Sequence, residues 1–124
     1  MTHPTIISIS LRLPSKACHP NARPHYMAKA NATAKDRKLA CYCALEAMGG
    51  QKFGWRSAVE TVVFNVKGHH DHANLSQWLK AYRDGFVDAG VLVNDDQLIH
   101  MPVKQIVDRK APTGVTVTLA RRDA

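Results

Sequence analysis

The stretch from Leu75 to Gly90 constrains the fold more than any other part of the sequence. Its apolar residues recur every three or four positions, a spacing that places them on one face of an α-helix. Gly90 follows where a helix commonly ends, because glycine readily adopts the left-handed conformation of the C′ position. The segment therefore predicts an amphipathic helix packed on a core. The apolar stripe consists of Leu75, Trp78, Leu79, Tyr82, Phe86 and Ala89.

Apolar alternation predicts strands on both sides of this helix. An alanine-rich segment that stops at Gly49-Gly50 predicts another helix. Pro102 marks a bulge or a sheet edge within a late strand. We expect a single α/β (α+β) domain over residues 1–124, with element order β-α-β-α-β-β and two main helices packed on a mixed sheet. The other expected elements are strands at Thr5–Leu13, Ala58–Lys67, Gln97–Asp108 and Val115–Ala120, and a helix at Ala28–Met48.

Charge is distributed unevenly along the chain. The 124 residues carry a formal net charge of +7. Residues 1–67 hold 10 Lys+Arg and three acids, whereas residues 68–124 hold seven of each sign. The basic excess predicts an anionic partner, with nucleic acid as the first candidate. Carboxylates repel phosphate, so the acidic residues of the second half suit a metal-dependent enzyme better than a simple nucleic-acid binder.

The cysteines and the hydropathy bear on the compartment. Cys18, Cys41 and Cys43 make an odd number without the spacing of a zinc knuckle or a redox pair. No apolar run approaches the roughly 18 residues of a membrane span, and no secretory signal opens the chain. We therefore expect reduced cysteines, a cytoplasmic location and no membrane association.

A proline-rich loop over residues 14–24 joins the first strand to the first helix. Together with the beginning of that helix it carries cations and amides that suit contacts with phosphates. The alternative is a generic charged surface. The candidate DNA-binding residues are Lys16, Asn21, Arg23, His25, Lys29 and Lys35.

Oxygen ligands flank the amphipathic helix. Asp71 and Asn74 stand at its beginning and Asp95 in the turn after it. Loops at element ends can direct several oxygens at one hard cation. However, a helix of about 16 residues is about 24 Å long, so the chain must turn back for Asp71 and Asp95 to meet. The alternative is that Asp71 or Asn74 caps the helix and that residues 94–96 form a solvated turn.

The histidines and Lys80 also have two interpretations each. His69, His70 and His72 could suggest zinc, but a zinc site needs three or four convergent ligands, so exposed loop histidines are the favoured interpretation. Lys80 either forms an exposed pair with Asp84 at i+4 or directs its charge at a phosphate.

These pieces together resemble a known family, the RusA-type Holliday junction resolvases of phages and prophages. The proline-rich segment 20–25 followed by Lys29 also looks like a segment of one phage branch. The central residues that carry the resemblance are Asp71-His72-Ala73-Asn74-Leu75, Lys80, Asp84-Gly85-Phe86, Gly90-Val91-Leu92 and Asn94-Asp95-Asp96-Gln97.

The resemblance implies a symmetric homodimer that cleaves four-way DNA junctions in recombination and repair. It implies that Asp71 and Asp95 bind Mg²⁺, with Mn²⁺ as a substitute, and that Lys80 is an active-site residue. The residues expected to support the site are Asn74, Asn94 and Asp84. The implied location is the nucleoid of a bacterial or phage-infected cell.

The sequence departs from the family pattern at one position. The second Asp of the pattern D-x-D-N falls on Ala73, and the loss of a metal carboxylate should remove most of the activity. Either a substitution was introduced to inactivate the protein, or the chain diverged naturally, with His70 or His72 as a partial substitute. A non-catalytic nucleic-acid-binding accessory protein is therefore one alternative, and a metal nuclease for flaps, forks or RNA is another.

Overall fold

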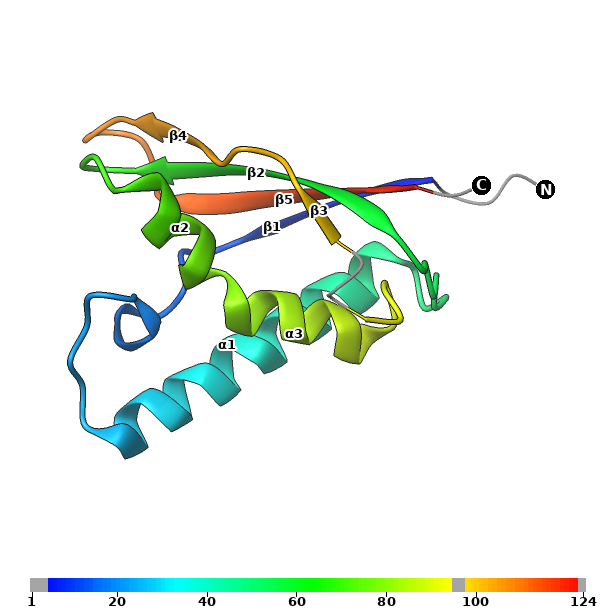
Figure 1. Ribbon diagram of the computed structural model, residues 1–124, viewed down its shortest axis with the longest axis horizontal. Coiled ribbons are helices and arrows are strands. Elements are labelled where there is room, and N and C mark those ends of the chain that lie inside the picture. Colours follow the sequence, from blue (N-terminus) through cyan, green and yellow to red (C-terminus); the bar gives the residue numbers. More distant parts are fainter. Residues whose placement is uncertain (1–4, 95–97, 123–124) are drawn as a thin grey trace.

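The computed structural model describes residues 5–94 and 98–122. They form a mixed α+β fold, the class that the sequence predicts. Figure 1 shows the sheet on one side and the helices on the other. The strands are β1 (Ile6–Leu11), β2 (Ala58–Val66), β3 (Leu98–His100), β4 (Lys104–Val107) and β5 (Gly114–Arg121). The helices are the 3₁₀ turn η1 (Lys16–Cys18), α1 (Tyr26–Ala47), α2 (His72–Trp78) and α3 (Lys80–Ala89).

The sheet is organised around β2. One neighbour, β5, runs antiparallel to β2 and also pairs antiparallel with β1 at the edge. On its other side β2 pairs in parallel with both β3 and β4, at the first and second halves of its length. The prediction of a central strand at Ala58–Lys67 is thus confirmed, and the strand ends at Val66.

The predicted strand Gln97–Asp108 is two strands. Gln97 lies outside the described residues, and residues 101–103 separate β3 from β4. Pro102 has no backbone N–H to donate to the ladder, which accounts for the interruption at that position. Met101 still donates to the Glu60 carbonyl at 3.0 Å, so the segment stays beside β2.

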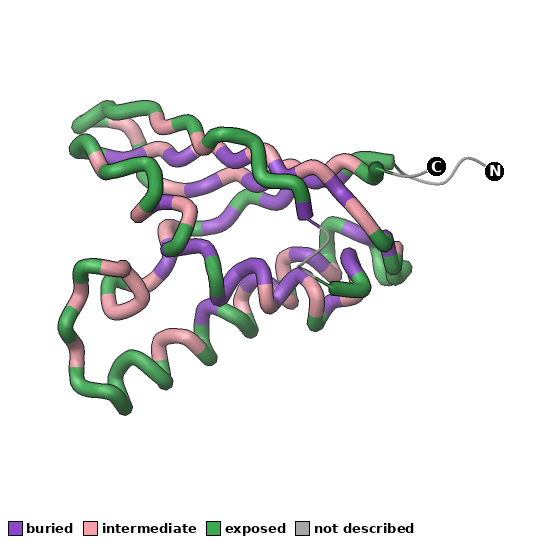
Figure 2. The backbone as a smooth tube through the Cα atoms, in the orientation of Figure 1, coloured by how far each residue is buried: buried purple, intermediate pink, exposed green. Residues whose placement is uncertain are grey.

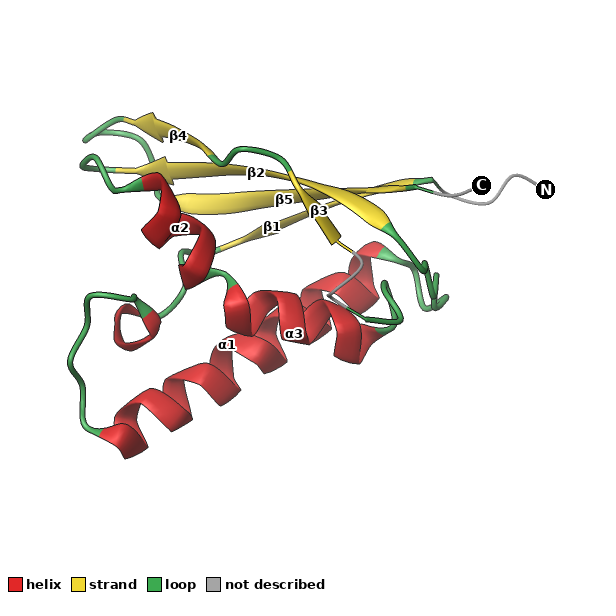
Figure 3. Cartoon of the chain, viewed as in Figure 1, coloured by secondary structure: helices red, strands yellow, loops and turns green. Residues whose placement is uncertain are grey.

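All helices pack on one face of the sheet, as the secondary-structure view makes clear (Figure 3). Alternate residues of β1, β2 and β5 point into this layer and are buried. The predicted apolar stripe faces them, with Leu75, Tyr82 and Phe86 at most 1% exposed. Gly90 ends α3 with φ 87°, the predicted left-handed C-cap. Figure 2 shows this buried layer between helices and strands.

The predicted single helix from Leu75 to Ala89 is two helices. Leu79 leaves helical geometry with φ −85° and ψ 0°, and α2 and α3 meet there at a bend (Figure 1). The bend keeps Trp78 and Leu79 buried although the chain changes direction. None of the helices within residues 5–94 and 98–122 combines the length and apolar content needed to cross a membrane.

Helix α1 begins two residues earlier than predicted. The His25 ring nitrogen Nδ1 accepts a hydrogen bond from the Met27 N–H at 3.2 Å and caps the helix. The first turns of α1 extend past the sheet, and Tyr26 and Met27 are 75% and 55% exposed. The later turns pack on α3, where Ala40 and Ala44 are fully buried. The basic first half of the chain therefore projects a helical arm into solvent (Figure 2).

Candidate functional site

Asp71 lies at the turn between β2 and α2 and caps α2. Its Oδ1 accepts hydrogen bonds from the Ala73 N–H at 2.9 Å and the Asn74 N–H at 3.3 Å. Both bonds fall on the same oxygen, and the residue is exposed. The capping role weighed from the sequence is therefore the observed one. The two capping hydrogen bonds use only Oδ1, which leaves the second carboxylate oxygen, Oδ2, as a possible ligand.

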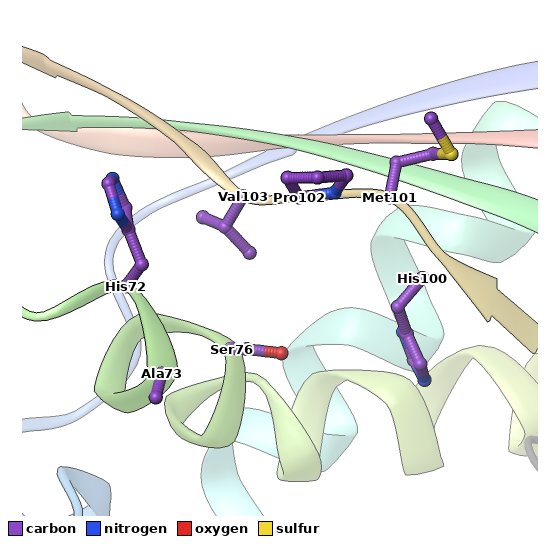
Figure 4. Close-up of a pocket in the computed structure, with 7 residues that line it drawn as sticks. All are labelled: His72, Ala73, Ser76, His100, Met101, Pro102 and Val103. Atoms are coloured by element: carbon purple, nitrogen blue, oxygen red, sulfur yellow. The ribbon is translucent and has the colours of Figure 1, made fainter.

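Ala73 lines a pocket of about 410 Å³ between α2 and the segment that joins β3 to β4. Figure 4 shows Ser76 directed across this pocket toward the side where His100 lies. A carboxylate at position 73 would therefore stand two residues from Asp71, at the rim of the pocket. The lining residues are His72, Ala73, Ser76, His100, Met101, Pro102 and Val103.

A buried ionic network adjoins this pocket through His100 and Ser76. Glu60 of β2 is 1% exposed and accepts two hydrogen bonds from the Arg83 guanidinium, at 2.7 and 2.9 Å. His100 Nδ1 lies 2.9 Å from the same carboxylate, and Arg83 also donates to the Ser76 carbonyl at 2.8 Å. Burial raises the pKa of Glu60, but Arg83 and His100 outweigh it and hold the pKa below its usual value. The network ties α2, α3, β2 and β3 together.

The sequence interpretation did not single out Glu60, Arg83 or His100, although a signal was present. Glu60 alternates with Val62 and Phe64 on the buried face of β2. A carboxylate on such a face needs a cationic partner. Arg83 follows the buried Tyr82 directly, so the helix that packs on β2 could have supplied one.

Lys80 begins α3, and its ammonium contacts Asp84 Oδ1 at 3.1 Å. Its side chain is 70% exposed, so the exposed i,i+4 pair is present as weighed from the sequence. On the same helix Asp88 binds Arg37 of α1, with Nη2 to Oδ1 at 2.8 Å. The hydrogen bonds and charge of Arg37 lower the pKa of Asp88.

Asp71 and Asn94 lie at the two ends of the α2–α3 segment. Asp95 lies outside the described residues, and its neighbour Asn94 lies next to Val93, whose N–H donates to the Trp55 carbonyl at 3.0 Å. Trp55 precedes β2, whereas Asp71 follows it, so the nine residues of β2 lie between the two places, and this strand is roughly 26 Å long from its first to its last Cα. Figure 1 shows how α2 and α3 follow one another along the sheet between these two places. Asn74 stays with Asp71 in the first turn of α2.

The candidate DNA-binding residues occupy the loop and the exposed arm of α1. Lys16, Asn21, Lys29 and Lys35 are exposed. Arg23 is exposed too, with its guanidinium folded onto the carbonyls of Pro20 and Ala22, at 3.3 and 3.0 Å. His25 caps α1. These side chains are therefore placed where a large anionic ligand can reach them.

The basic loop lies beside the Asp71 turn. Trp78 of α2 donates its Nε1–H to the Ser15 carbonyl at 2.9 Å. The ring centroids of His19 and His70 are 5.9 Å apart, and His70 directly precedes Asp71. Residues about 50 positions apart in the sequence thus form one surface.

The histidines do not converge on a metal site. The ring of His69 lies near that of His72, with centroids 6.1 Å apart, whereas His70 packs with Trp78. Within residues 5–94 and 98–122, no group of three or more His, Cys, Asp or Glu side chains is placed to hold a metal ion.

The comparisons with known proteins identify no family. No protein-family model matches the chain, and no curated protein matches it either. Among solved structures, thiamine-monophosphate kinase from Stenotrophomonas maltophilia K279a is 17% identical, with a TM-score of 0.28. The match covers 96% of this chain but only 31% of the kinase, and a similarity this weak carries no argument about function.

Proposed function

We propose that the chain has the architecture of a Mg²⁺-dependent, structure-selective DNA endonuclease that acts on four-way junctions as a homodimer, and that Ala73 impairs its catalysis. One observation carries the proposal: the basic loop packs beside the turn that presents Asp71. A nuclease needs cations that hold phosphates next to carboxylates that bind metal. The resemblance to RusA-type resolvases supplies the substrate class.

The chain as it stands supplies an incomplete metal site. Mg²⁺ commonly binds one or two carboxylates and keeps several waters. Asp71 offers one exposed carboxylate, and Ala73 offers no ligand. The described residues therefore supply one carboxylate of the set that the resemblance implies, and we derive no metal-dependent step for the unmodified chain. An aspartate at position 73 would give a second carboxylate on the same turn of α2.

Other residues have roles that do not depend on the ion. The exposed ammonium of Lys80 would offset the charge that grows on a phosphate under attack. Lys16, Arg23, Lys29 and Lys35 would hold DNA arms through phosphates, so binding should weaken steeply with salt. The exposed arm of α1 carries two of these lysines away from the sheet.

The uncovered face of the sheet supports the homodimer. Strand register places alternate residues of all five strands on this face, and Lys104 is the one charged side chain among them in the described strands. Ile99 and Ile106 are 37% and 54% exposed there. A flat surface with little charge and no covering helix suits a self-complementary two-fold interface. Such a dimer could act on two symmetry-related strands of a junction.

A nucleic-acid-binding accessory protein without catalysis is the second candidate. Ala73, which offers no metal ligand where the family pattern has an aspartate, favours it. A nuclease for flaps, forks or RNA uses the same site residues and differs in substrate only.

Restoring the missing carboxylate tests the proposal. Labelled four-way junctions, flaps, forks, duplexes and RNA are incubated with Mg²⁺ or Mn²⁺ and either the unmodified chain or Ala73→Asp. We expect Ala73→Asp to cleave junctions at least about 100-fold faster than the unmodified chain, in line with the contribution of a metal-activated site.

The double variant Ala73→Asp/Asp71→Asn is the matched control and should lose the gained activity. Binding of junctions without cleavage by any form would refute the nuclease and favour the accessory protein. Preferential cleavage of flaps, forks or RNA would replace the proposed substrate by one of these.

A further inference from the structure

A second hollow, distinct from the pocket beside Ala73, lies between the basic loop, the end of β2 and α2. Its volume is about 630 Å³, within the range of small-ligand sites, roughly 300–1,000 Å³. Figure 1 shows the loop that follows β1, the end of β2 and α2 at the same end of the molecule. The lining residues are Leu13, Lys16, His19, Asn21, Ala22, Val66, Lys67, Gly68, His70, Trp78 and Thr113.

Aromatic rings line the hollow. The His19 ring packs edge-on against the Trp78 indole, with the ring centroids 5.0 Å apart. The His70 ring stacks near-parallel to the same indole, with a centroid distance of 6.0 Å and an interplanar angle of 27°. Burial and the neighbouring His70 both lower the pKa of His19, so its ring is neutral near pH 7. The half-buried rings of His19 and His70 therefore offer flat faces on which a planar group can stack.

The walls are held in place by hydrogen bonds within the protein. Trp78 is fixed to Ser15, and Ser15 in turn donates its N–H and its hydroxyl to the buried carboxylate of Asp36, at 2.7 and 2.6 Å. On the opposite wall the side-chain amide of Gln105 exchanges two hydrogen bonds with the backbone of His70, at 3.0 and 2.8 Å. A ligand would thus enter a preformed site, which lowers the entropic cost of binding.

The charge of the lining selects an anion. Lys16 of η1 and Lys67 after β2 are exposed and line the hollow, and no Asp or Glu is among the described residues that line it. Asn21 adds an amide at the rim. Aromatic faces inside and ammonium groups at the rim match a nucleotide, whose base is planar and whose phosphate is anionic.

We propose that this hollow binds one unpaired nucleotide of a DNA strand, with the base against the His19, His70 and Trp78 rings and the phosphate between Lys16 and Lys67. The inference rests on the proposed function and deepens it, because His70 adjoins Asp71. A base paired within a duplex cannot enter a hollow, whereas a strand that leaves a helix at a branch point has bases free to do so. The site would therefore favour branched or single-stranded DNA over continuous duplex.

The test uses the emission of Trp78. The variant Trp55→Phe leaves Trp78 as the single tryptophan, and Trp55 is buried against Phe53 away from the hollow. Oligothymidylate should quench this emission on titration, and a duplex of equal length should quench it much less. In this background His70→Ala should raise the Kd for oligothymidylate about tenfold through lost stacking.

Matched variants control for general effects. His69→Ala removes a neighbouring exposed ring that does not line the hollow and should leave the Kd unchanged. Lys16→Gln/Lys67→Gln should weaken binding more than Lys52→Gln/Lys110→Gln, which removes equal charge elsewhere. Circular dichroism shows whether each variant is folded.

Three results would overturn the inference: no response of Trp78 to oligothymidylate, an equal response to duplex, or an equal loss with His69→Ala. None of these depends on cleavage. If the Trp78 emission responds as expected while Ala73→Asp cleaves nothing, the nucleotide site is supported and the proposed nuclease activity is refuted. If Ala73→Asp cleaves junctions while Trp78 is silent, only the hollow is refuted.

Discussion

Asp71 combines a structural role with a proposed chemical one, and two substitutions separate them. Asparagine caps helices about as well as aspartate but carries no charge to hold a metal. In the Ala73→Asp background we expect Asp71→Asn to abolish Mg²⁺-dependent cleavage and to leave the free energy of unfolding nearly unchanged. Asp71→Ala should abolish cleavage and also cost about 0.5–2 kcal/mol of stability, because the Ala73 and Asn74 N–H groups lose their acceptor.

Denaturant unfolding and the junction assay on the same preparations measure both quantities. Cleavage that survives in Asp71→Asn would remove Asp71 from the metal site and leave it as a cap only. Equal stability of the Asn and Ala variants would contradict the observed capping hydrogen bonds.

Glu60 makes the stability depend on pH. Its pKa is lower in the folded chain than in the unfolded one, so the ionised carboxylate contributes stability above its unfolded pKa of about 4.3. That contribution is lost as the pH falls through the folded value. Glu60→Gln leaves Arg83 buried without a carboxylate and should cost roughly 3–5 kcal/mol at pH 7. The difference from the unmodified chain should narrow below about pH 4.

Urea unfolding at a series of pH values measures this difference. Glu46→Gln, at an exposed position of α1, is the matched control and should have little effect at any pH. A difference between Glu60→Gln and the unmodified chain that is constant from neutral to acidic pH would disprove the electrostatic origin.

At the scale of elements, the contact between α1 and α3 depends on Gly85. A Cβ on this residue would clash with the Arg37 carbonyl and would stand 2.7 Å from the Ala40 Cβ. Helix propensity alone makes alanine better than glycine by about 0.8–1.0 kcal/mol. Steric overlap should reverse that sign, so we expect Gly85→Ala to destabilise the protein by about 1–3 kcal/mol.

Thermal and urea unfolding of Gly85→Ala determine the sign. Gly68→Ala is the control, since no atom lies within 4 Å of a Cβ at that position. A stabilised Gly85→Ala would show that α1 and α3 can separate without cost.

The same elements show what the sequence could predict. The apolar stripe and Gly90 were enough to predict helical structure and its buried face, because the spacing of apolar residues and the capping of a helix are local properties of the sequence. The bend at Leu79 was not predictable from them, since Trp78 and Leu79 stay in phase with the stripe on either side of it. Pro102 correctly predicted an irregularity in the late strand. That β3 and β4 both pair with β2 was not predictable, because pairing depends on the tertiary register of the strands.

The site was less predictable than the fold. Asp71 was found as a cap and as a candidate ligand, because both roles follow from its place before a helix. The hollow around Trp78 required the loop to return to α2, where Ser15 accepts a hydrogen bond from Trp78 and donates to the distant Asp36. Local patterns carry no information about such contacts. The Glu60–Arg83 ion pair was partly predictable. The position of Glu60 on the buried face of a strand indicates that it needs a cationic partner, but it does not indicate which residue that partner is.

At the scale of the whole molecule, the two ends of the α2–α3 segment lie near opposite ends of β2. Asp71 lies at the end of β2, and Asn94 lies near its beginning. Asp95 follows Asn94 directly in the chain. Asp95 itself lies outside the described residues. We propose that a metal site that uses both Asp71 and Asp95, as the resemblance implies, draws them from two protomers of the proposed dimer. The uncovered sheet face is the surface that would join those protomers.

Mixing two inactive variants tests this arrangement. In the Ala73→Asp background, Asp71→Asn and Asp95→Asn should each be inactive as homodimers. If the carboxylates come from different protomers, a heterodimer of the two variants contains one site with both substitutions and one site with none. Unfolding and refolding the variants together should therefore restore cleavage of one strand per junction, up to about a quarter of the activity of Ala73→Asp, since half of the dimers are mixed and each has one of two sites intact. Sites built within one protomer would stay broken in every dimer, so a mixture as inactive as its components would contradict the shared site.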